Sequence, residues 1–237
     1  MNANEPVRPG TAIVACIEPH VGHERAFNAW YERDHFYDAM MAGPGACAAA
    51  RYVATRECKQ QRVGVGHLAD RVRGSYLTLA WLLPGLADEW NAWVGRRMAG
   101  LRDAPDRLFV ARDHVYTAIY RFEFDVRGDG GPVPIVALDR DFAGVVAVSF
   151  GDGLDDARHW AEAVVSPAVP LLVGLAPERT ILAEVDPGDH AVVVGFCVDD
   201  PRVAWATRLA STLDIATSGG GPFVRTVPGT DTYVDEL

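Results

Sequence analysis

The sequence has very little lysine and no long apolar run. Lys59 is its one lysine, and 22 basic residues stand against 32 acidic ones, a net charge of −10. Nucleic acids and anionic membranes are bound through basic surfaces that neutralise phosphate, so this balance disfavours both partners. No window approaches 18 consecutive apolar residues, which argues against a membrane span. The polar first ten residues lack the basic start and apolar core of a secretory signal, so we expect a cytoplasmic protein.

Familiar catalytic and cofactor motifs are scarce as well. The four cysteines form no CxxC pair, which argues against a zinc or disulfide framework. The glycine run 219–221 lacks the strand-then-helix context of a phosphate loop, and no GxSxG nucleophile elbow occurs. Nothing indicates nicotinamide or flavin binding. We therefore expect neither a metal nor a bound cofactor.

The sequence does contain an ordered alternation of strand and helix patterns. Apolar residues make up 49% of the 237 positions, enough for a substantial core and for two units of about 110 residues. Periodicity and breaker residues predict the order β-α-β-β-α-β, then a linker at 128–134, then a similar order again. The first unit, 1–127, has expected strands at 11–17, 46–55, 75–83 and 114–125 and helices at 24–41 and 86–101. The second, 135–237, has expected strands at 144–150, 180–185 and 191–198, helices at 155–173 and 201–213, and a short final strand at 223–227 or 230–234.

An internal duplication would explain this repeated order. Aligning Trp81 with Phe196 places Trp90 on Trp205 without a gap, and a second gapless register pairs the tryptophans of the two leading helices. The two offsets differ because the first unit has an extra segment, 56–74. That segment is either a lid over a pocket or a disordered excursion, and we weigh the two equally.

A family resemblance supports the two-unit interpretation. The helix segment 27–35 reads FNAWYERDH and is followed by GPG at 43–45 and ARY at 50–52. This resembles the dimeric α/β-barrel superfamily, in which an FNxWYxxxH helix precedes a PG turn and an RxY strand; EthD-like proteins and cofactor-free monooxygenases and cyclases are among its members. The resemblance implies an α+β fold in which two ferredoxin-like βαββαβ repeats form a dimeric α/β-barrel-like arrangement within one chain.

The candidate catalytic residues lie on the first helix. Asn28, Tyr31 and His35 are spaced i, i+3, i+7 and so project along one strip of an α-helix. An amide can hold a carbonyl or enolate oxygen, a phenol can exchange a proton, and an imidazole titrates near neutrality. Asp38, one turn beyond, is placed to orient the imidazole. The resemblance supports Asn28 and His35 in particular; the alternative is a histidine bonded to its own helix.

The first unit is also the expected place of the pocket. In the register that pairs the leading tryptophans, Val165 replaces His35 and Arg158 replaces Asn28, so the second unit lacks these polar groups. Large side chains of the first unit are candidates to bind a flat apolar substrate, although core packing explains most of them and Arg51 has Glu32 and Asp34 as alternative partners. These candidates are Trp30, Arg51, Tyr76, Trp81 and Trp90.

The function that these patterns favour is small-molecule chemistry without a cofactor. We expect an acid/base enzyme acting on a hydrophobic aromatic, polyketide-like or terpenoid-like ligand, of cyclase, dehydratase or monooxygenase type. The alternative is a non-catalytic accessory protein that binds such a ligand. The resemblance also extends to haem proteins, in which case His114 or His190 is the candidate axial ligand. The partner is then a hydrophobic small molecule, and a homodimer is left open.

Overall fold

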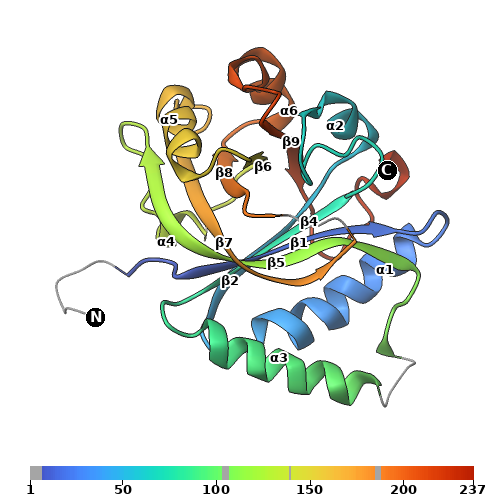
Figure 1. Ribbon diagram of the computed structural model, residues 1–237. Coiled ribbons are helices and arrows are strands. Elements are labelled where there is room, and N and C mark those ends of the chain that lie inside the picture. Colours follow the sequence, from blue (N-terminus) through green and yellow to red (C-terminus); the bar gives the residue numbers. More distant parts are fainter. Residues whose placement is uncertain (1–6, 103–106, 139, 185–187) are drawn as a thin grey trace.

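The computed structural model describes residues 7–102, 107–138, 140–184 and 188–237 (Figure 1). Within these, nine strands form one antiparallel sheet in the order β2-β4-β1-β5-β7-β8-β6-β9-β3. Strand β2 also pairs with β9, which closes eight strands into a barrel. The strands are β1 Thr11–Pro19, β2 Ala46–Val53, β3 Val63–Gly64, β4 Tyr76–Leu82, β5 Arg112–Arg127, β6 Gly144–Phe150, β7 Leu171–Ala183, β8 Ala191–Cys197 and β9 Ser218–Arg225.

The helices lie outside this barrel in two groups (Figure 1). One group is α1 with two π-helical segments after it, together with α3; the other is α5 and α6, the latter continued by further turns. The predicted α+β class is therefore confirmed. The helical segments are α1 Glu24–Trp30 with Tyr31–His35 and Tyr37–Met41, α2 Arg56–Gln61, α3 Ala87–Arg102, α4 Pro134–Ala137, α5 Leu154–Val164, α6 Pro201–Ala204 with Trp205–Leu209 and Ala210–Thr212, and a last turn Val234–Glu236.

The barrel has one extensive seam and one short seam. Strands β5 and β7 pair over eleven residue positions, whereas β2 and β9 pair at two. On one side of the long seam the strand order is β2-β4-β1-β5, and on the other it is β7-β8-β6-β9. If the four strands of each group are numbered along the chain, both groups have the spatial order second, third, first, fourth.

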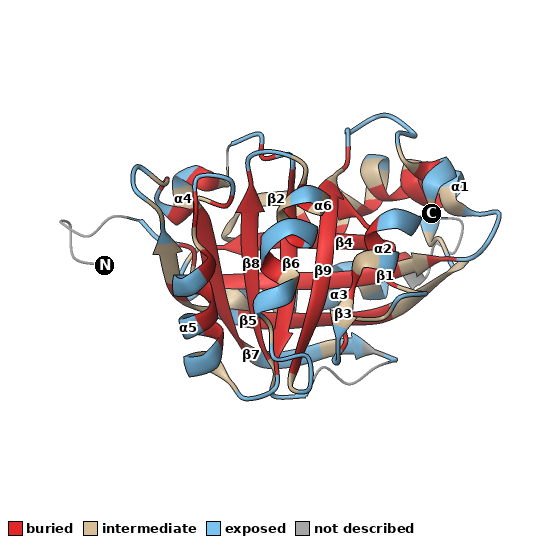
Figure 2. Ribbon diagram, turned by 90° about the horizontal axis from the view of Figure 1, so that it is seen from above, coloured by how far each residue is buried: buried red, intermediate tan, exposed pale blue. Residues whose placement is uncertain are grey.

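Side-chain alternation gives every strand an inner and an outer face. In β1, Ala12 and Val14 pair across the sheet with Tyr120 and Ala118 and face the barrel interior. The intervening residues face the helices. Because both faces are covered, all of β1 except Glu18 is buried, and buried residues extend along most of the barrel strands (Figure 2).

The helix layer of the second half is tightly packed. Trp160 of α5 and Trp205, which follows α6, are buried against the outer faces of β6 and β8. Phe124 and Phe150 complete this cluster. It is a closed apolar core in the described residues.

The predicted helix 155–173 is wrong in its second part. Helix α5 ends at Val164, and Leu171 already begins β7. Pro167 and Pro170 explain the change, because proline lacks the N–H that a helix needs and disfavours helical geometry in the residue before it. The strand expected at 180–185 therefore begins nine residues earlier.

The last strand was also misjudged. It covers Ser218–Arg225 and includes the glycine run, whereas residues 230–234 form turns. The glycines permit close backbone packing: a Cβ on Gly219 would meet the Val65 carbonyl, and one on Gly220 would meet that of Ala147. Glycine has a low propensity for β-strands, which is why the prediction omitted this run; here the glycines are required by the close backbone packing.

The extra segment 56–74 is an ordered plug on one end of the barrel. It contains α2 and the short β3, which extends the sheet beside β9. Arg62 is 1% exposed and donates to the backbone carbonyls of Asp70, Arg73 and Gly74. The cavity described below has no lining residue from this segment, so neither the lid nor the disordered alternative holds.

Arg62→Met should lower the free energy of unfolding by about 3–5 kcal/mol, because three buried carbonyls lose a charged donor. Chemical denaturation measures this change. Arg208→Met is the control, since Arg208 is exposed, and it should stay within about 0.5 kcal/mol of the parent protein. Equal stability of the two variants would show that the plug does not depend on Arg62.

Candidate active site

A cavity of about 590 Å³ separates the first-half helices from the sheet. Its floor is the outer face of β1 and β5, and its walls are the π-helical segments and α3. The overhanging end of β7 also contributes, so the second half completes a cavity of the first. Most of the lining is apolar: Ile13, Ala15, Ile17, Ala39, Met40, Trp90, Val94, Met98, Leu108, Ile181 and Leu182.

His35 lies on the wall of this cavity. Its ring stacks on Trp30 at a centroid distance of 4.6 Å and meets Tyr31 edge-on at 5.0 Å. Its Nδ1 is buried without a hydrogen-bond partner. Burial, followed by the charge of Arg112, lowers the pKa of His35 to about 3, so the imidazole is neutral at physiological pH.

Strand β5 contributes two further polar groups. Arg112 and His114 alternate along the strand and both line the cavity. The Arg112 guanidinium lies 4.7 Å from the Trp30 ring centroid, and its Nε is buried without a partner. His114 lies 3.3 Å from the Thr117 hydroxyl, and burial, then Arg112, lowers its pKa to about 4. His35 and Arg112 therefore both contact the Trp30 ring.

Tyr31 lines the same cavity and is 1% exposed. Its hydroxyl donates to the Met40 sulfur at 3.8 Å, a weak acceptor, and the Thr78 side chain is a second hydrogen-bonding neighbour. Burial raises the pKa of Tyr31, so the phenol is neutral. It is a donor that a substrate oxygen can recruit.

Asn28 is not brought to the cavity. Its amide donates to the Thr230 carbonyl at 2.8 Å and accepts from Arg51 at 2.9 Å. The expected strip of Asn28, Tyr31 and His35 assumed α-helical geometry throughout. The segment from Tyr31 to His35 is π-helical, and its wider turn rotates His35 away from the Asn28 face.

Arg51 is likewise occupied elsewhere. It is 5% exposed, donates to Glu32 at 3.1 Å, and lies between the rings of Tyr31 and Tyr76 at 4.3 and 4.7 Å. The sequence offered Glu32 and Asp34 as carboxylate partners of Arg51, and the structure shows the pair with Glu32. Arg51 and Tyr76 thus pack beneath the helix and do not line the cavity.

Asp38 does not orient His35. Its carboxylate pairs with Arg97 of α3 at 2.6 Å and with Arg107, and the pairing with Arg97 lowers the Asp38 pKa. These pairs tie α3 to the π-helical segment instead. The imidazole has Trp30 as its packing partner.

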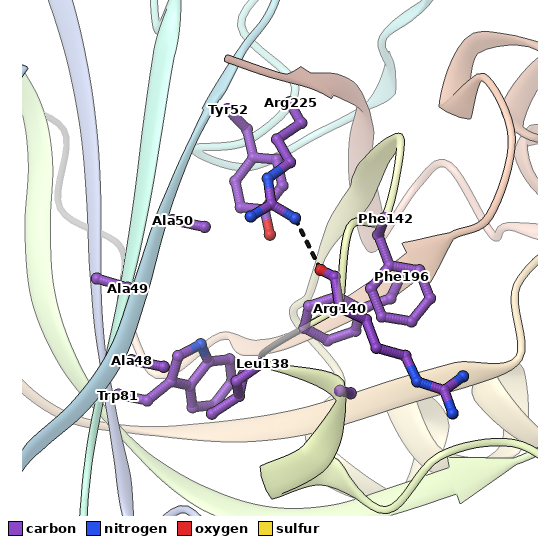
Figure 3. Close-up of a pocket in the computed structure, with 11 residues that line it drawn as sticks. Ala48, Ala49, Ala50, Tyr52, Trp81, Leu138, Arg140, Phe142, Phe196 and Arg225 are labelled. Carbon is purple, nitrogen blue, oxygen red and sulfur yellow. Dashed lines mark hydrogen bonds between the residues drawn. The ribbon is translucent and has the colours of Figure 1, made fainter. Parts of the chain in front are cut away.

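The three candidate tryptophans have different positions. Trp90 lines the cavity and donates to the Met40 carbonyl. Trp30 lies behind His35 and donates to the Arg107 carbonyl at 2.9 Å. Trp81 faces the barrel interior, at a separate pocket of about 10 Å³ near Phe196 (Figure 3). That volume holds about one water, so Trp81 is far from any sizeable ligand.

Sequence reasoning missed Arg112 and the contributions of β7. Arg112 falls two residues before the expected strand, although the alternation of Arg112 and His114 is a signal that both share a face. Ile181 was placed in a strand, but nothing in the sequence shows that it reaches the other half. No group of three His, Cys, Asp or Glu side chains in the described ranges is placed to hold a metal ion, and every described helix is too short or too polar to cross a bilayer.

Comparison with known proteins identifies the fold. No family model and no curated protein sequence matches the chain. The structure of an anthrone oxidase-like protein has a TM-score of 0.55 at 11% identity, covering 94% of this chain and 95% of its own. A protein of Fusobacterium nucleatum assigned as a monooxygenase has a TM-score of 0.53 at 10% identity, with 92% of each chain covered. A variant of DypB from Rhodococcus jostii in complex with heme has a TM-score of 0.51 at 11% identity, covering 99% and 98%.

The chain shares the fold of these proteins, an α+β architecture around a closed antiparallel barrel of eight strands. Each of these matches covers more than nine tenths of both chains, so the shared architecture includes both halves. At identities of 10–11% these matches show a shared fold only, so the reaction has to be argued from the residues of the site.

Asn28→Ala should lower the free energy of unfolding by about 1–3 kcal/mol, because Arg51 loses an acceptor and the C-terminal segment loses a donor. Binding of anthracene methanol, followed by its fluorescence, should not change. Asn91→Ala is the matched variant: Asn91 lines the cavity, so this change should alter binding and leave stability within about 0.5 kcal/mol. If Asn28→Ala weakened binding and Asn91→Ala did not, Asn28 would have to be counted among the ligand-binding residues.

Gly95→Leu should obstruct the cavity mouth. Gly95 lines the cavity on α3, and a Cβ there meets nothing within 4 Å, so a larger side chain is accommodated without strain. Replacing a helical glycine also raises helix propensity by up to ~1 kcal/mol. Anthracene methanol should bind about tenfold more weakly while the protein unfolds at the same or a higher temperature. Gly100→Leu, on the same helix and outside the cavity, should bind normally.

Proposed function

We propose that this chain is a cofactor-independent acid/base enzyme that acts on a hydrophobic aromatic, polyketide-like or terpenoid-like small molecule. The observation that carries this proposal is the unpartnered Nδ1 of His35, buried on the wall of a large, mostly apolar cavity. The Nδ1 atoms of His67 and His190 are also buried without a partner, but neither of those residues lines the cavity, whereas His35 does. The substrate supplies the missing partner.

His35 is the proton acceptor in this proposal. Its imidazole is neutral in the free protein, so a nitrogen lone pair is available to an activated C–H or O–H group. As the proton moves, the substrate becomes an anion, and that negative charge favours the imidazolium and raises the pKa of His35. Tyr31 turns its hydroxyl from the Met40 sulfur to the substrate oxygen. Proton removal of this kind initiates cyclisation, dehydration and cofactor-free oxygenation.

The structural neighbours support an enzymatic role. They include an anthrone oxidase-like protein and a protein assigned as a monooxygenase. An anthrone is a flat three-ring ketone with acidic C–H bonds, and its shape suits a cavity between a sheet and two helices. The substrate class proposed here agrees with that name.

We further propose that the two halves are ferredoxin-like repeats, 1–127 and 135–237. The strand orders on the two sides of the long seam support this division, as each corresponds to a βαββαβ unit. Trp81 and Phe196 both lie in the third strand of their unit. The second repeat then serves chiefly as the structural partner of the first.

Haem suits this cavity less well than an organic acid. Haem carries two propionates, whereas Arg112 is the one cationic side chain lining the described cavity. His190 is not among the lining residues and lies near His67 at the plugged barrel end. His114 lines the cavity, but it lies next to the cation. A ligand-binding accessory role without catalysis differs from the enzyme proposal in whether a bound ligand exchanges protons.

Proton exchange on anthrone tests the catalytic role. In D₂O, the protein should accelerate deuterium incorporation into the acidic methylene, followed by NMR, and His35→Gln should reduce this acceleration by at least about 100-fold. His190→Gln is the control, since it changes a histidine outside the cavity, and it should retain the rate. Exchange at the parent rate in His35→Gln would eliminate His35 as the base. Binding of anthrone without any acceleration would favour the accessory role.

A further inference from the structure

We infer that the substrate of this cavity carries a single acidic group, which is a carboxylate or an acidic phenol or enol, and that Arg112 binds this group. This inference rests on the proposed function only in using the same cavity. Arg112 lines the cavity at the start of β5, and its guanidinium lies over the Trp30 ring. No described carboxylate lies within ion-pair distance of it, and its Nε is buried without a partner.

Two other arginines, which are more deeply buried than Arg112, have oxygen partners within the protein. Arg51 has Glu32 and the amide of Asn28, and Arg62 has three backbone carbonyls. Each therefore has oxygen acceptors within the protein, although the Nε atoms of both, and one Nη atom of Arg51, are buried without a partner as well. A cation taken from water without such partners destabilises the fold, because the lost hydration is not replaced. At Arg112 the cation–π contact with Trp30 replaces part of it, and an anionic ligand replaces the rest.

The surrounding groups set the charge of the ligand. His35 and His114 are the titratable side chains that accompany Arg112 in the lining besides Tyr31, and all three are neutral at physiological pH. The polar end of the cavity therefore has a charge of +1. One negative charge balances it, and two would leave an unpaired anion in an apolar cavity. A planar guanidinium also binds two oxygens of one carboxylate at once.

The rest of the cavity determines the body of the ligand. From the polar end, apolar side chains of β1, α3 and β7 continue the lining, including Ala15, Val94 and Leu182. The ligand that matches this arrangement has a flat apolar body and an acidic group at one end. His35 lies near Arg112 and so faces the substrate atoms next to the acidic group. A negative charge that forms there when His35 removes a proton can delocalise through the flat ring system.

A matched pair of fluorescent probes tests this inference. Anthracene carboxylate and anthracene methanol have the same three rings and differ in charge. The parent protein should bind the carboxylate about tenfold or more tightly than the alcohol at neutral pH, the effect expected of a charge-assisted hydrogen bond. Arg112→Met keeps the length of the side chain and removes the charge, so it should abolish the preference and leave alcohol binding within about twofold. Arg112→Lys should retain part of the preference.

The outcomes separate this inference from the proposed function. A preference that persists in Arg112→Met, or equal binding of the two probes by the parent protein, would overturn the role of Arg112 and leave the cavity and His35 untouched. Loss of anthrone exchange in His35→Gln, with the carboxylate preference intact, would support both. Failure of the parent protein to bind either probe would contradict the ligand cavity itself. Thermal unfolding confirms that each variant is folded, and Arg112→Lys serves if Arg112→Met is not.

Discussion

The long antiparallel pairing of β5 with β7 is the constraint on which the cavity depends. It joins the two halves over eleven positions, while the opposite seam has two. Because β5 runs for 16 residues, it extends past the barrel and carries Arg112 and His114 beneath the first-half helices. Its partner β7 follows it and delivers Ile181 and Leu182 to the same place. A shorter seam would close the barrel without building this wall.

Three arginines away from bulk water show how partners distinguish structural from functional cations. Arg62 holds the plug through backbone carbonyls, and Arg51 holds helix, sheet and C-terminal segment together through Asn28 and Glu32. Each has oxygen acceptors for part of its guanidinium, which lowers the cost of its burial. Arg112 has a ring and no carboxylate among the described residues. Arg51 and Arg62 are buried and Arg112 is partly buried, and the oxygen acceptors that the fold supplies to the first two distinguish them from Arg112.

The sequence predicted the first half well because its signals are local. The expected strand at 75–83 and the helix at 86–101 agree with β4 and α3 within about a residue, since periodicity and breakers act over one turn or one strand. The second half was harder: prolines broke a pattern that read as helix to residue 173, and glycines concealed the last strand. The prolines are a local signal that the prediction overlooked, whereas the glycines have a tertiary packing reason that one window of sequence does not show.

The site was predictable in part for the same reason. His35 and Tyr31 lie on the cavity wall because helical periodicity placed them on one side, but the π-helical segment removed Asn28 from it. Arg112 reaches the cavity through the pairing of β5 with β1, and Ile181 reaches it through the strand register between the halves. Register depends on pairing of residues about 60 positions apart, and a single sequence without relatives carries no signal of it.

The difference between the two helix layers explains why one half has a cavity. In the register that pairs Trp30 with Trp160, His35 corresponds to Val165, where α5 has already ended. The first helix instead continues through two π-helical segments to Met41, which lifts α3 away from the sheet and leaves space beneath it. In the second half the corresponding space is filled, and Arg158 packs over Phe124 at 4.2 Å. An extended helix therefore opens a cavity and positions a histidine on its wall at the same time, so gaining or losing that extension changes both together.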